Sequence, residues 1–225
     1  MENSFTRMVN MVAKLRSDEG CLWDKQQTPA SAAPYLIEEA YEVIETIEEN
    51  DQEKLKEELG DLLLQVIFQA QMAAESGDFT ITEVLEEACE KLIRRHPHVF
   101  AGLKVKDVNE ILANWERIKL SEKKGKSSSE QSPLAGIPKH LPSLLLARRV
   151  QDKLGRFDSI SNDPEEAVCQ VEAGWKAFKE NSLGKDEAEK ELGSLLFHLV
   201  NLARIRGLDA ETILRNKVRS DYWIP

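Results

Sequence analysis

Hydrophobic positions recur every three or four residues along most of this chain, and no segment shows the convincing apolar–polar alternation of a strand. In the first half, the periodicity predicts helices over about residues 4–16, 29–49, 52–75, 81–95 and 108–123, with a loop over 17–28. In the second half, it predicts helices over about residues 139–153, 164–181, 185–206 and 210–222. The pattern therefore predicts an all-α fold.

Local signals mark several helix ends. Pro29 lies in the first turn of the helix over 29–49, where its missing N–H costs nothing. Thr80 and Glu83 have the spacing of a capping box at the start of the helix over 81–95. Pro97 follows that helix and limits its extension. These signals fix the bounds of the predicted helices more sharply than periodicity alone.

A change in composition separates the two halves. Residues 122–133 read EKKGKSSSEQSP, a polar stretch rich in serine that is typical of a flexible linker. We therefore predict one domain over residues 1–122, a linker over 123–133 and a second domain over 134–225.

The second half repeats part of the first. The segment ELGDLL at 58–63 matches ELGSLL at 191–196, an offset that also places the dipeptide Glu-Ala at 39–40 on the same dipeptide at 172–173. Such a fixed offset indicates an internal duplication.

Four carboxylates stand out in the first half: Glu39, Glu42, Glu58 and Asp61. Each pair is spaced i,i+3, which places it on one face of a helix, and the two pairs are mirrored about Asn50. A helical hairpin that reverses there would bring all four together. Acidic residues on helices are usually solvated, but like charges gathered beside apolar stripes need a cation. Oxygen-only ligands favour Mg²⁺ or Mn²⁺, and the Glu-x-x-His motif of di-iron bundles is missing.

Basic residues lie between and after the acidic pairs along the chain. Lys91, Arg94 and Arg95 end the helix over 81–95, and Lys54 lies one turn before Glu58. Such cations would suit the phosphates of a substrate that Mg²⁺ bridges. They could equally complement the dipole of a helix C-terminus, and Lys54 could merely pair with Glu58.

The duplicated half lacks part of this chemistry. At the same offset, Trp175 replaces Glu42 and Ser194 replaces Asp61. We therefore predict that the second domain is catalytically inert and stabilises a dimer or covers the site of the first domain.

Composition and charge argue against a nucleic-acid-binding, membrane-spanning or disulfide-stabilised protein. The 225 residues carry a net charge of −10, which disfavours broad binding of nucleic acid. No apolar run approaches the length of a membrane span, and the N-terminus lacks the features of a signal peptide. The cysteines are scattered singly and odd in number, which favours a reducing cytoplasm over a disulfide framework.

Four segments together resemble the MazG nucleoside triphosphate pyrophosphohydrolases. They are IEEAYEV at 37–43, EELGDLL at 57–63, RRHPHVF at 94–100 and the loop GCLWDKQQT at 20–28. The resemblance spans nearly the whole chain as a tandem pair of MazG-like domains. It implies an all-α, Mg²⁺-dependent homodimer that splits nucleoside triphosphates into the monophosphate and pyrophosphate, a housecleaning reaction of the nucleotide pool.

The resemblance also implies roles for individual residues. The metal ligands would be Glu39, Glu42, Glu58 and Asp61, and Glu38 would orient or deprotonate the attacking water. The substrate-binding residues would be Lys54, Lys91, Arg94, Arg95, Trp115 and Trp23. Trp115 could instead be a core residue, and Trp23 could seal the end of a bundle. For His96 and His98, a role in the turn after the helix is the default interpretation.

Two other functions remain open from the sequence. One is a non-catalytic helical module whose acidic hairpin binds a partner or cations. The other is a pyrophosphatase restricted to one nucleotide, such as dUTP or dCTP. No Ser/His/Asp arrangement and no P-loop motif points to a different hydrolase.

Overall fold

A computed structural model describes residues 3–123, 134, 136–155, 159–179 and 184–223 of the chain. These residues form helices and turns with no strand, which confirms the all-α fold. The chain divides into two compact units, Met1–Glu122 and Lys123–Pro225. Residues 124–133 of the predicted linker lie outside the described ranges.

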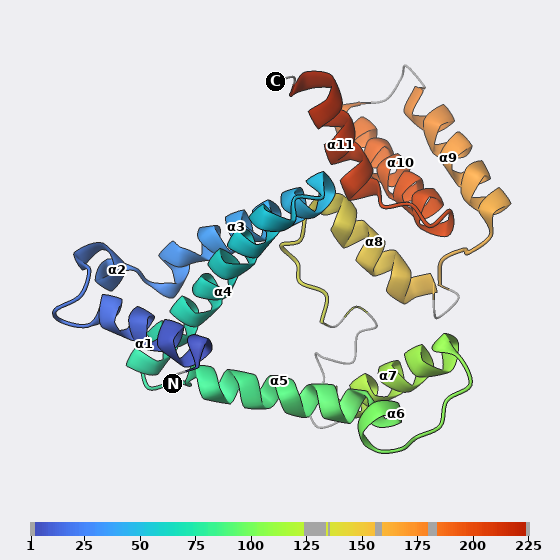
Figure 1. The fold of residues 1–225 in the computed structure, drawn as a ribbon. Helices are drawn as coiled ribbons and strands as arrows, with labels where there is room; N and C mark the ends of the chain where they lie inside the picture. Colours follow the sequence, from blue (N-terminus) through green and yellow to red (C-terminus); the bar gives the residue numbers. More distant parts are fainter. Residues whose placement is uncertain (1–2, 124–133, 135, 156–158, 180–183, 224–225) are drawn as a thin grey trace. The chain divides into compact units, whose positions relative to one another are not determined.

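The first unit is built around a long antiparallel helical hairpin (Figure 1). Its helices are α1 (Ser4–Arg16), α2 (Leu22–Gln26), α3 (Pro29–Glu49), α4 (Gln52–Glu75), α5 (Ile81–Arg95), α6 (Pro97–Phe100) and α7 (Val108–Lys123). Helix α3 packs along α4, and α1 packs on α4 and α2. Helix α5 contacts α4 and α6.

The hairpin turn has a clear local cause. Asn50 ends α3 in the left-handed conformation at φ 56°, which asparagine tolerates better than most residues. Asp51 then caps α4, since its side chain accepts hydrogen bonds from the backbone N–H groups of Glu53 and Lys54. The chain thus reverses at the position about which the acidic pairs are mirrored.

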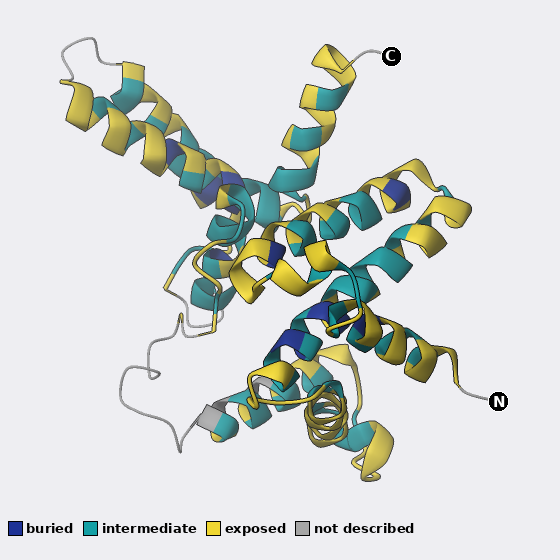
Figure 2. Ribbon diagram, turned by 90° about the vertical axis from the view of Figure 1, so that its left-hand side faces the viewer, coloured by how far each residue is buried: buried dark blue, intermediate teal, exposed yellow. Residues whose placement is uncertain are grey.

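The hydrophobic core lies at the end of the hairpin that is distant from this turn. It consists of Val12, Ala32, Ile67, Phe68 and Met72, with partly buried neighbours that include Phe5, Tyr35 and Ile81. Figure 2 shows that buried positions are few and that most helical surface is half-buried or exposed. The four acidic positions therefore lie between the core and the turn.

Arg16 fastens the connection between α1 and α3 to the core. Its buried guanidinium donates to the backbone carbonyls of Asp24 and Gln27 and pairs with Glu75 at 2.7 Å. The segment predicted as a plain loop over 17–28 therefore contains a short helix, α2, at its centre.

The second unit contains α8 (Ser143–Leu154), α9 (Pro164–Lys179), α10 (Lys185–Ile205) and α11 (Ala210–Tyr222). Helix α10 packs against α9 and α8, and its core combines Ala167, Leu195 and Val200 with two buried amides, Gln151 and Asn201. The helix predicted to run to residue 181 is described to Lys179, and residues 180–183 lie outside the described ranges.

No helix in the described part of the chain combines the length and apolarity needed to cross a membrane.

Candidate metal centre and nucleotide-binding residues

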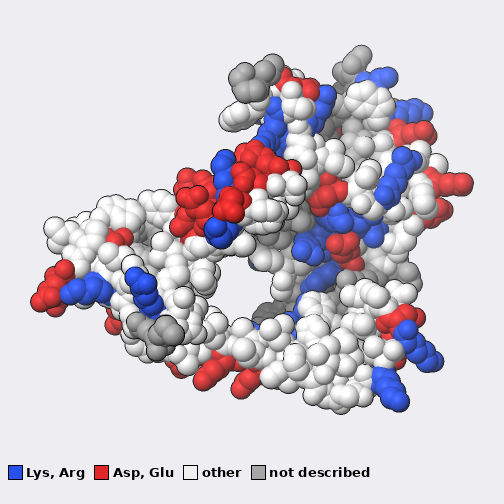
Figure 3. Space-filling view, viewed as in Figure 1, with Lys and Arg blue, Asp and Glu red and all other residues white. Residues whose placement is uncertain are grey.

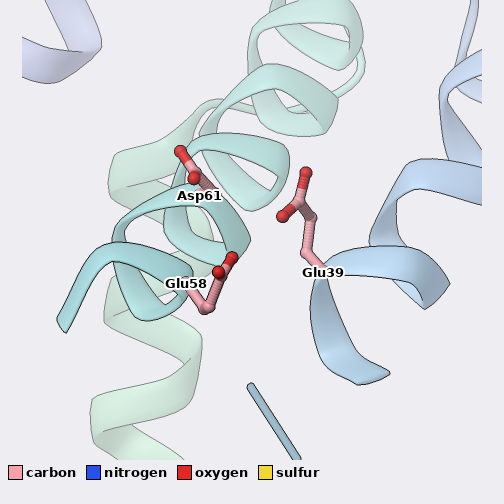
Figure 4. Close-up of side chains that lie close together, drawn as sticks. All are labelled: Glu39, Glu58 and Asp61. Carbon is pink, nitrogen blue, oxygen red and sulfur yellow. The ribbon is translucent and has the colours of Figure 1, made fainter. Parts of the chain in front are cut away.

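Three carboxylates from the two hairpin helices converge on one point. Glu39 comes from α3, while Glu58 and Asp61 come from neighbouring turns of α4. Each offers one oxygen, and these oxygens all lie within 4.8 Å of one another. Figure 4 shows Glu39 reaching from α3 toward the turns of α4 that carry Glu58 and Asp61. The i,i+3 spacing on α4 and the antiparallel packing of α3 together produce this arrangement.

Glu42 lies beside this group without joining it. Its carboxyl shares a hydrogen bond with that of Glu39, and its charge acts on both Glu39 and Glu58. The oxygens that meet within 4.8 Å are those of the other three residues. The hairpin thus brings together three of the four predicted ligands and holds the fourth at their edge.

The concentration of negative charge perturbs the group. The pKa of Glu39 is raised above its ordinary 4.5, first by desolvation between the helices and then by the charges of Glu42 and Asp61. The pKa of Glu58 is also raised, by desolvation and then by the Glu42 charge, while Lys54 acts in the opposite direction. Figure 3 shows acidic side chains gathered over the half of α3 and α4 next to the turn. A bound cation would relieve this repulsion.

Two other predicted residues adjoin the acidic group. Lys54 is exposed one turn before Glu58, and its charge favours the ionised form of that carboxyl. Glu38 is exposed on α3 and is not one of the three converging carboxylates. Of these two, Lys54 is the residue that the structure links to the acidic group.

The arginines at the end of α5 form a second cluster with α7. Arg94 Nε lies 2.6 Å from Glu122 Oε1, and Arg95 Nη2 lies 2.6 Å from Glu122 Oε2. The hydrogen bond from Arg95, followed by that from Arg94, lowers the pKa of Glu122 to about 2. The sequence places residue 122 both near the end of the predicted helix over 108–123 and at the start of the polar stretch, and in the structure it lies in the last turn of α7.

Trp115 belongs to this second cluster. The Arg95 guanidinium carbon lies 5.7 Å from the centre of its ring, and Lys119 Nζ lies 4.1 Å from it. Lys91 pairs instead with Glu87 on its own helix, at 2.6 Å. The structure therefore joins Arg94, Arg95 and Trp115 to one another rather than to the acidic group.

Trp23 lies elsewhere in the first unit. It is exposed over about half its surface and meets the edge of Tyr35, with ring centres 6.1 Å apart. His96 joins α5 to α6, where its Nδ1 lies 2.7 Å from the Leu92 carbonyl oxygen. That position fits the turn role expected of it.

Residues 27–100 match the MazG nucleotide pyrophosphohydrolase domain. A protein of Thermotoga maritima named nucleoside triphosphate pyrophosphohydrolase/pyrophosphatase MazG is 46% identical over 220 residues, which are 96% of this chain and 81% of that protein. A nucleoside triphosphate pyrophosphohydrolase of Escherichia coli K12 is 41% identical over 95% of this chain and 82% of its own length.

The chain belongs to the MazG family. The matched segment contains the whole α3–α4 hairpin and ends with α6. It therefore includes all four acidic positions and both arginines of α5.

The second unit of this MazG protein differs at the equivalent positions. Glu172 is exposed on α9, and Glu191 is half-buried on α10. Trp175 stands where the first unit has Glu42, and Lys179 Nζ lies 5.6 Å from the centre of its ring. Among the residues that the structure describes, the group in the first unit is the one place where three or more potential metal-ligating side chains meet.

Proposed function

We propose that this chain hydrolyses (deoxy)nucleoside triphosphates to the nucleoside monophosphate and pyrophosphate, with Mg²⁺ or Mn²⁺ bound by the first unit, in the housecleaning of the nucleotide pool. The names of its relatives and its family membership support the general reaction. The observation that carries the metal dependence is the convergence of Glu39, Glu58 and Asp61 within 4.8 Å.

The donor set fits a hard divalent cation. All three side chains offer oxygen, Glu42 supplies further negative charge at the edge, and like charges at this spacing are costly without a counter-ion. A metal held there would polarise phosphoryl oxygens and lower the pKa of bound water. Glu38, next to this group in sequence, is the proposed residue that orients or deprotonates the attacking water.

The reaction needs no covalent nucleophile from the protein. The water oxygen forms a new bond to phosphorus, the bond between phosphorus and the bridging oxygen of the α and β phosphates breaks, and one proton is released. Positioning and electrostatic stabilisation supply most of the rate gain in such transfers. Positive side chains stabilise the charge that develops on the leaving pyrophosphate.

The proposed substrate contacts lie in different parts of the first unit. Lys54 adjoins the carboxylates, and the triphosphate would draw on it and on Lys91, Arg94 and Arg95. Trp115 offers an aromatic face for the base, and its ring already lies against cations. Trp23 is exposed and available to line a pocket.

We further propose that the protein acts as a cytoplasmic homodimer. Leu59, Leu63 and Val66 form a row on α4 that is between 39% and 50% exposed. Their counterparts at residues 192, 196 and 199 are leucines with similar exposure. Such a continuous apolar row on a helix favours a protein partner. The described cysteines are free, in keeping with a reducing compartment.

The test is a product assay with the purified chain. Incubation with mixed nucleoside triphosphates and Mg²⁺ should release monophosphate and pyrophosphate in equal amounts. Asp61→Asn should abolish the release, whereas Glu86→Gln, which removes an exposed carboxylate of α5, should leave it unchanged.

Other outcomes of this assay contradict the proposal in distinct ways. Orthophosphate as the sole product would indicate a phosphatase, and no turnover would indicate a helical interaction module. Assays with one nucleotide at a time would reveal an enzyme restricted to a substrate such as dUTP or dCTP. Near-normal turnover by Asp61→Asn would show that the metal centre is wrongly placed.

A further inference from the structure

The carboxylate of Glu122 on α7 forms ion pairs with two arginines of α5, Arg94 and Arg95. Glu122 Oε1 accepts from Arg94 Nε at 2.6 Å and from Arg95 Nε at 3.4 Å, and Glu122 Oε2 accepts from Arg95 Nη2 at 2.6 Å. Helix α7 presents Trp115, Lys119 and Glu122 at spacings i, i+4 and i+7, so that all three share one face of that helix. Arg95 is the side chain of α5 that contacts both Glu122 and Trp115 from this face.

Charge in this cluster is not balanced by Glu122. Two guanidinium groups, those of Arg94 and Arg95, share the one carboxylate of Glu122. Each guanidinium has five N–H donors, and Glu122 takes only a few of them. The cluster therefore retains positive charge and unused donors for an anion with more oxygens and more charge than a carboxylate.

The geometry of the ion pairs suggests which anion that is. Arginine donors recognise carboxylate and phosphate oxygens with the same planar fork, so a carboxylate can occupy a place that suits phosphate. The neighbouring Trp115 ring offers a stacking surface next to that place. An anion that combines phosphates with a planar base matches both features.

We propose that Glu122 is an internal competitor of the triphosphate: its carboxylate occupies the phosphate-binding side of Arg94 and Arg95 and leaves when substrate binds. This inference rests on the proposed function, because it takes the two arginines as phosphate ligands. Glu122 lies one residue before the end of α7, where fraying of a helix costs little. The competitor can therefore withdraw without disturbing Trp115, two turns earlier.

A purely structural role for Glu122 and the proposed competition predict opposite effects of its removal on nucleotide binding. If it only clamps α7 to α5, its removal should loosen the face that carries Trp115 and weaken binding of the nucleotide. If it competes, its removal should strengthen binding, because the arginines no longer exchange one anion for another. Exposed ion pairs are each worth up to about fivefold in an equilibrium constant, so we expect a change of about threefold to tenfold.

The test compares Glu122→Gln with the unmodified chain in two measurements. The KM for a nucleoside triphosphate should fall about threefold to tenfold, with kcat within about twofold. The Kd for inorganic tripolyphosphate, measured by calorimetry, should fall by a similar factor. Glu86→Gln, which removes a carboxylate of α5 nine residues before Arg95, should change neither value. An unchanged or higher KM and Kd for a folded Glu122→Gln would overturn the proposal.

Two further arms keep the test decisive. If Glu122→Gln does not fold, Glu122→Asp serves instead, because it retains the charge but withdraws it by one methylene, and an intermediate gain in tripolyphosphate affinity is expected. If the unmodified chain hydrolyses no nucleotide, the proposed function fails, while the tripolyphosphate measurement still tests the competitor. Loss of tripolyphosphate binding in Arg95→Gln would place that anion on the cluster, and retention of full binding would contradict it.

Discussion

The convergence of the three carboxylates predicts that neutralising one of them changes stability in opposite ways without and with metal. Glu39→Gln removes one charge from three carboxylates that lie within 4.8 Å, yet keeps the shape of the side chain and an acceptor for Gln65. Without metal, the variant should be more stable than the unmodified protein, because like-charge repulsion is relieved. With Mg²⁺, it should gain less stability, because the ion has lost a ligand.

The magnitude follows from the geometry. Two unit charges 4.8 Å apart repel by about 0.9 kcal/mol in water, and physiological salt reduces this to about 0.5 kcal/mol. Glu39 is only partly buried, so this figure, rather than that of a dry interior, applies to its interaction with Asp61. We expect the metal-free variant to melt about 2–4 °C higher than the unmodified protein.

The metal term can be sized in the same way. Mg²⁺ at ten times its Kd should stabilise the protein by about 1.4 kcal/mol, or about 6–11 °C in the midpoint of unfolding. If Glu39→Gln weakens binding tenfold, the same concentration should add only about 0.4 kcal/mol. Thermal melts followed by circular dichroism, in EDTA and in Mg²⁺, measure both terms.

The refuting result is equally specific. A variant that melts lower in EDTA and gains as much from Mg²⁺ as the unmodified protein would show that Glu39 neither suffers repulsion nor binds the ion. Glu86→Gln is the matched control, since it removes one exposed glutamate charge outside the acidic group and should respond to Mg²⁺ normally.

Three further predictions follow from other features of the first unit. The pKa values of Glu39 and Glu58 are raised above 4.5, and metal ligands must be ionised, so Mg²⁺ affinity should fall as the pH drops from about 7 toward 5. Titrations with Mg²⁺ at several pH values measure this, and an affinity independent of pH would contradict it. Arg16→Ala should cost about 3 kcal/mol in chemical denaturation, because it removes the cation that pairs with Glu75 and the donor shared by two backbone carbonyls. A loss below about 1 kcal/mol would refute that role. Asn50→Ala should destabilise the hairpin by about 1 kcal/mol while Asn50→Gly should be nearly neutral, because only alanine is strained at φ 56°; equal melting temperatures would contradict this.

Most helices of the first unit could be predicted from the sequence because their ends carry local signals. Periodicity and caps give the bounds of α3, α4 and α5, including the capping box of Thr80 and Glu83. Helix α2 was missed, because five residues are too few for periodicity and its last carbonyls are satisfied by Arg16 from another helix. Helix α8 begins at Ser143 rather than near 139, since Pro142 disfavours helical geometry in the residue before it.

The site was predictable to the extent that it depends on helix spacing. Mirrored i,i+3 pairs were enough to bring Glu39, Glu58 and Asp61 together, because the hairpin register fixes their backbones. Spacing cannot fix side-chain direction, which is why Glu42 lies at the edge of the group. Glu122 could not be found from sequence, because its contacts with the arginines span 27 and 28 residues and depend on how α7 meets α5.

The duplication shows which parts of the first unit the hairpin needs. At the offset of 133, Ile67 falls on Val200, but Phe68 falls on Asn201, a buried amide that donates to the Ser161 carbonyl. In the first unit, Arg16 of α1 donates to Asp24 in the segment that precedes the hairpin. In the second unit, Arg204 of α10 similarly donates to Asn162, just before α9, at 2.9 Å.

The second hairpin therefore persists with different core chemistry and without two of the four carboxylates. If the acidic residues were needed for folding, their loss at positions 175 and 194 would have required a compensating charge in the same place, and instead a tryptophan and a serine stand there. The hairpin is thus a scaffold that tolerates either set of side chains. It follows that Asp61→Asn should fold normally, so that a loss of activity in that variant reports on the chemistry of the site and not on the fold.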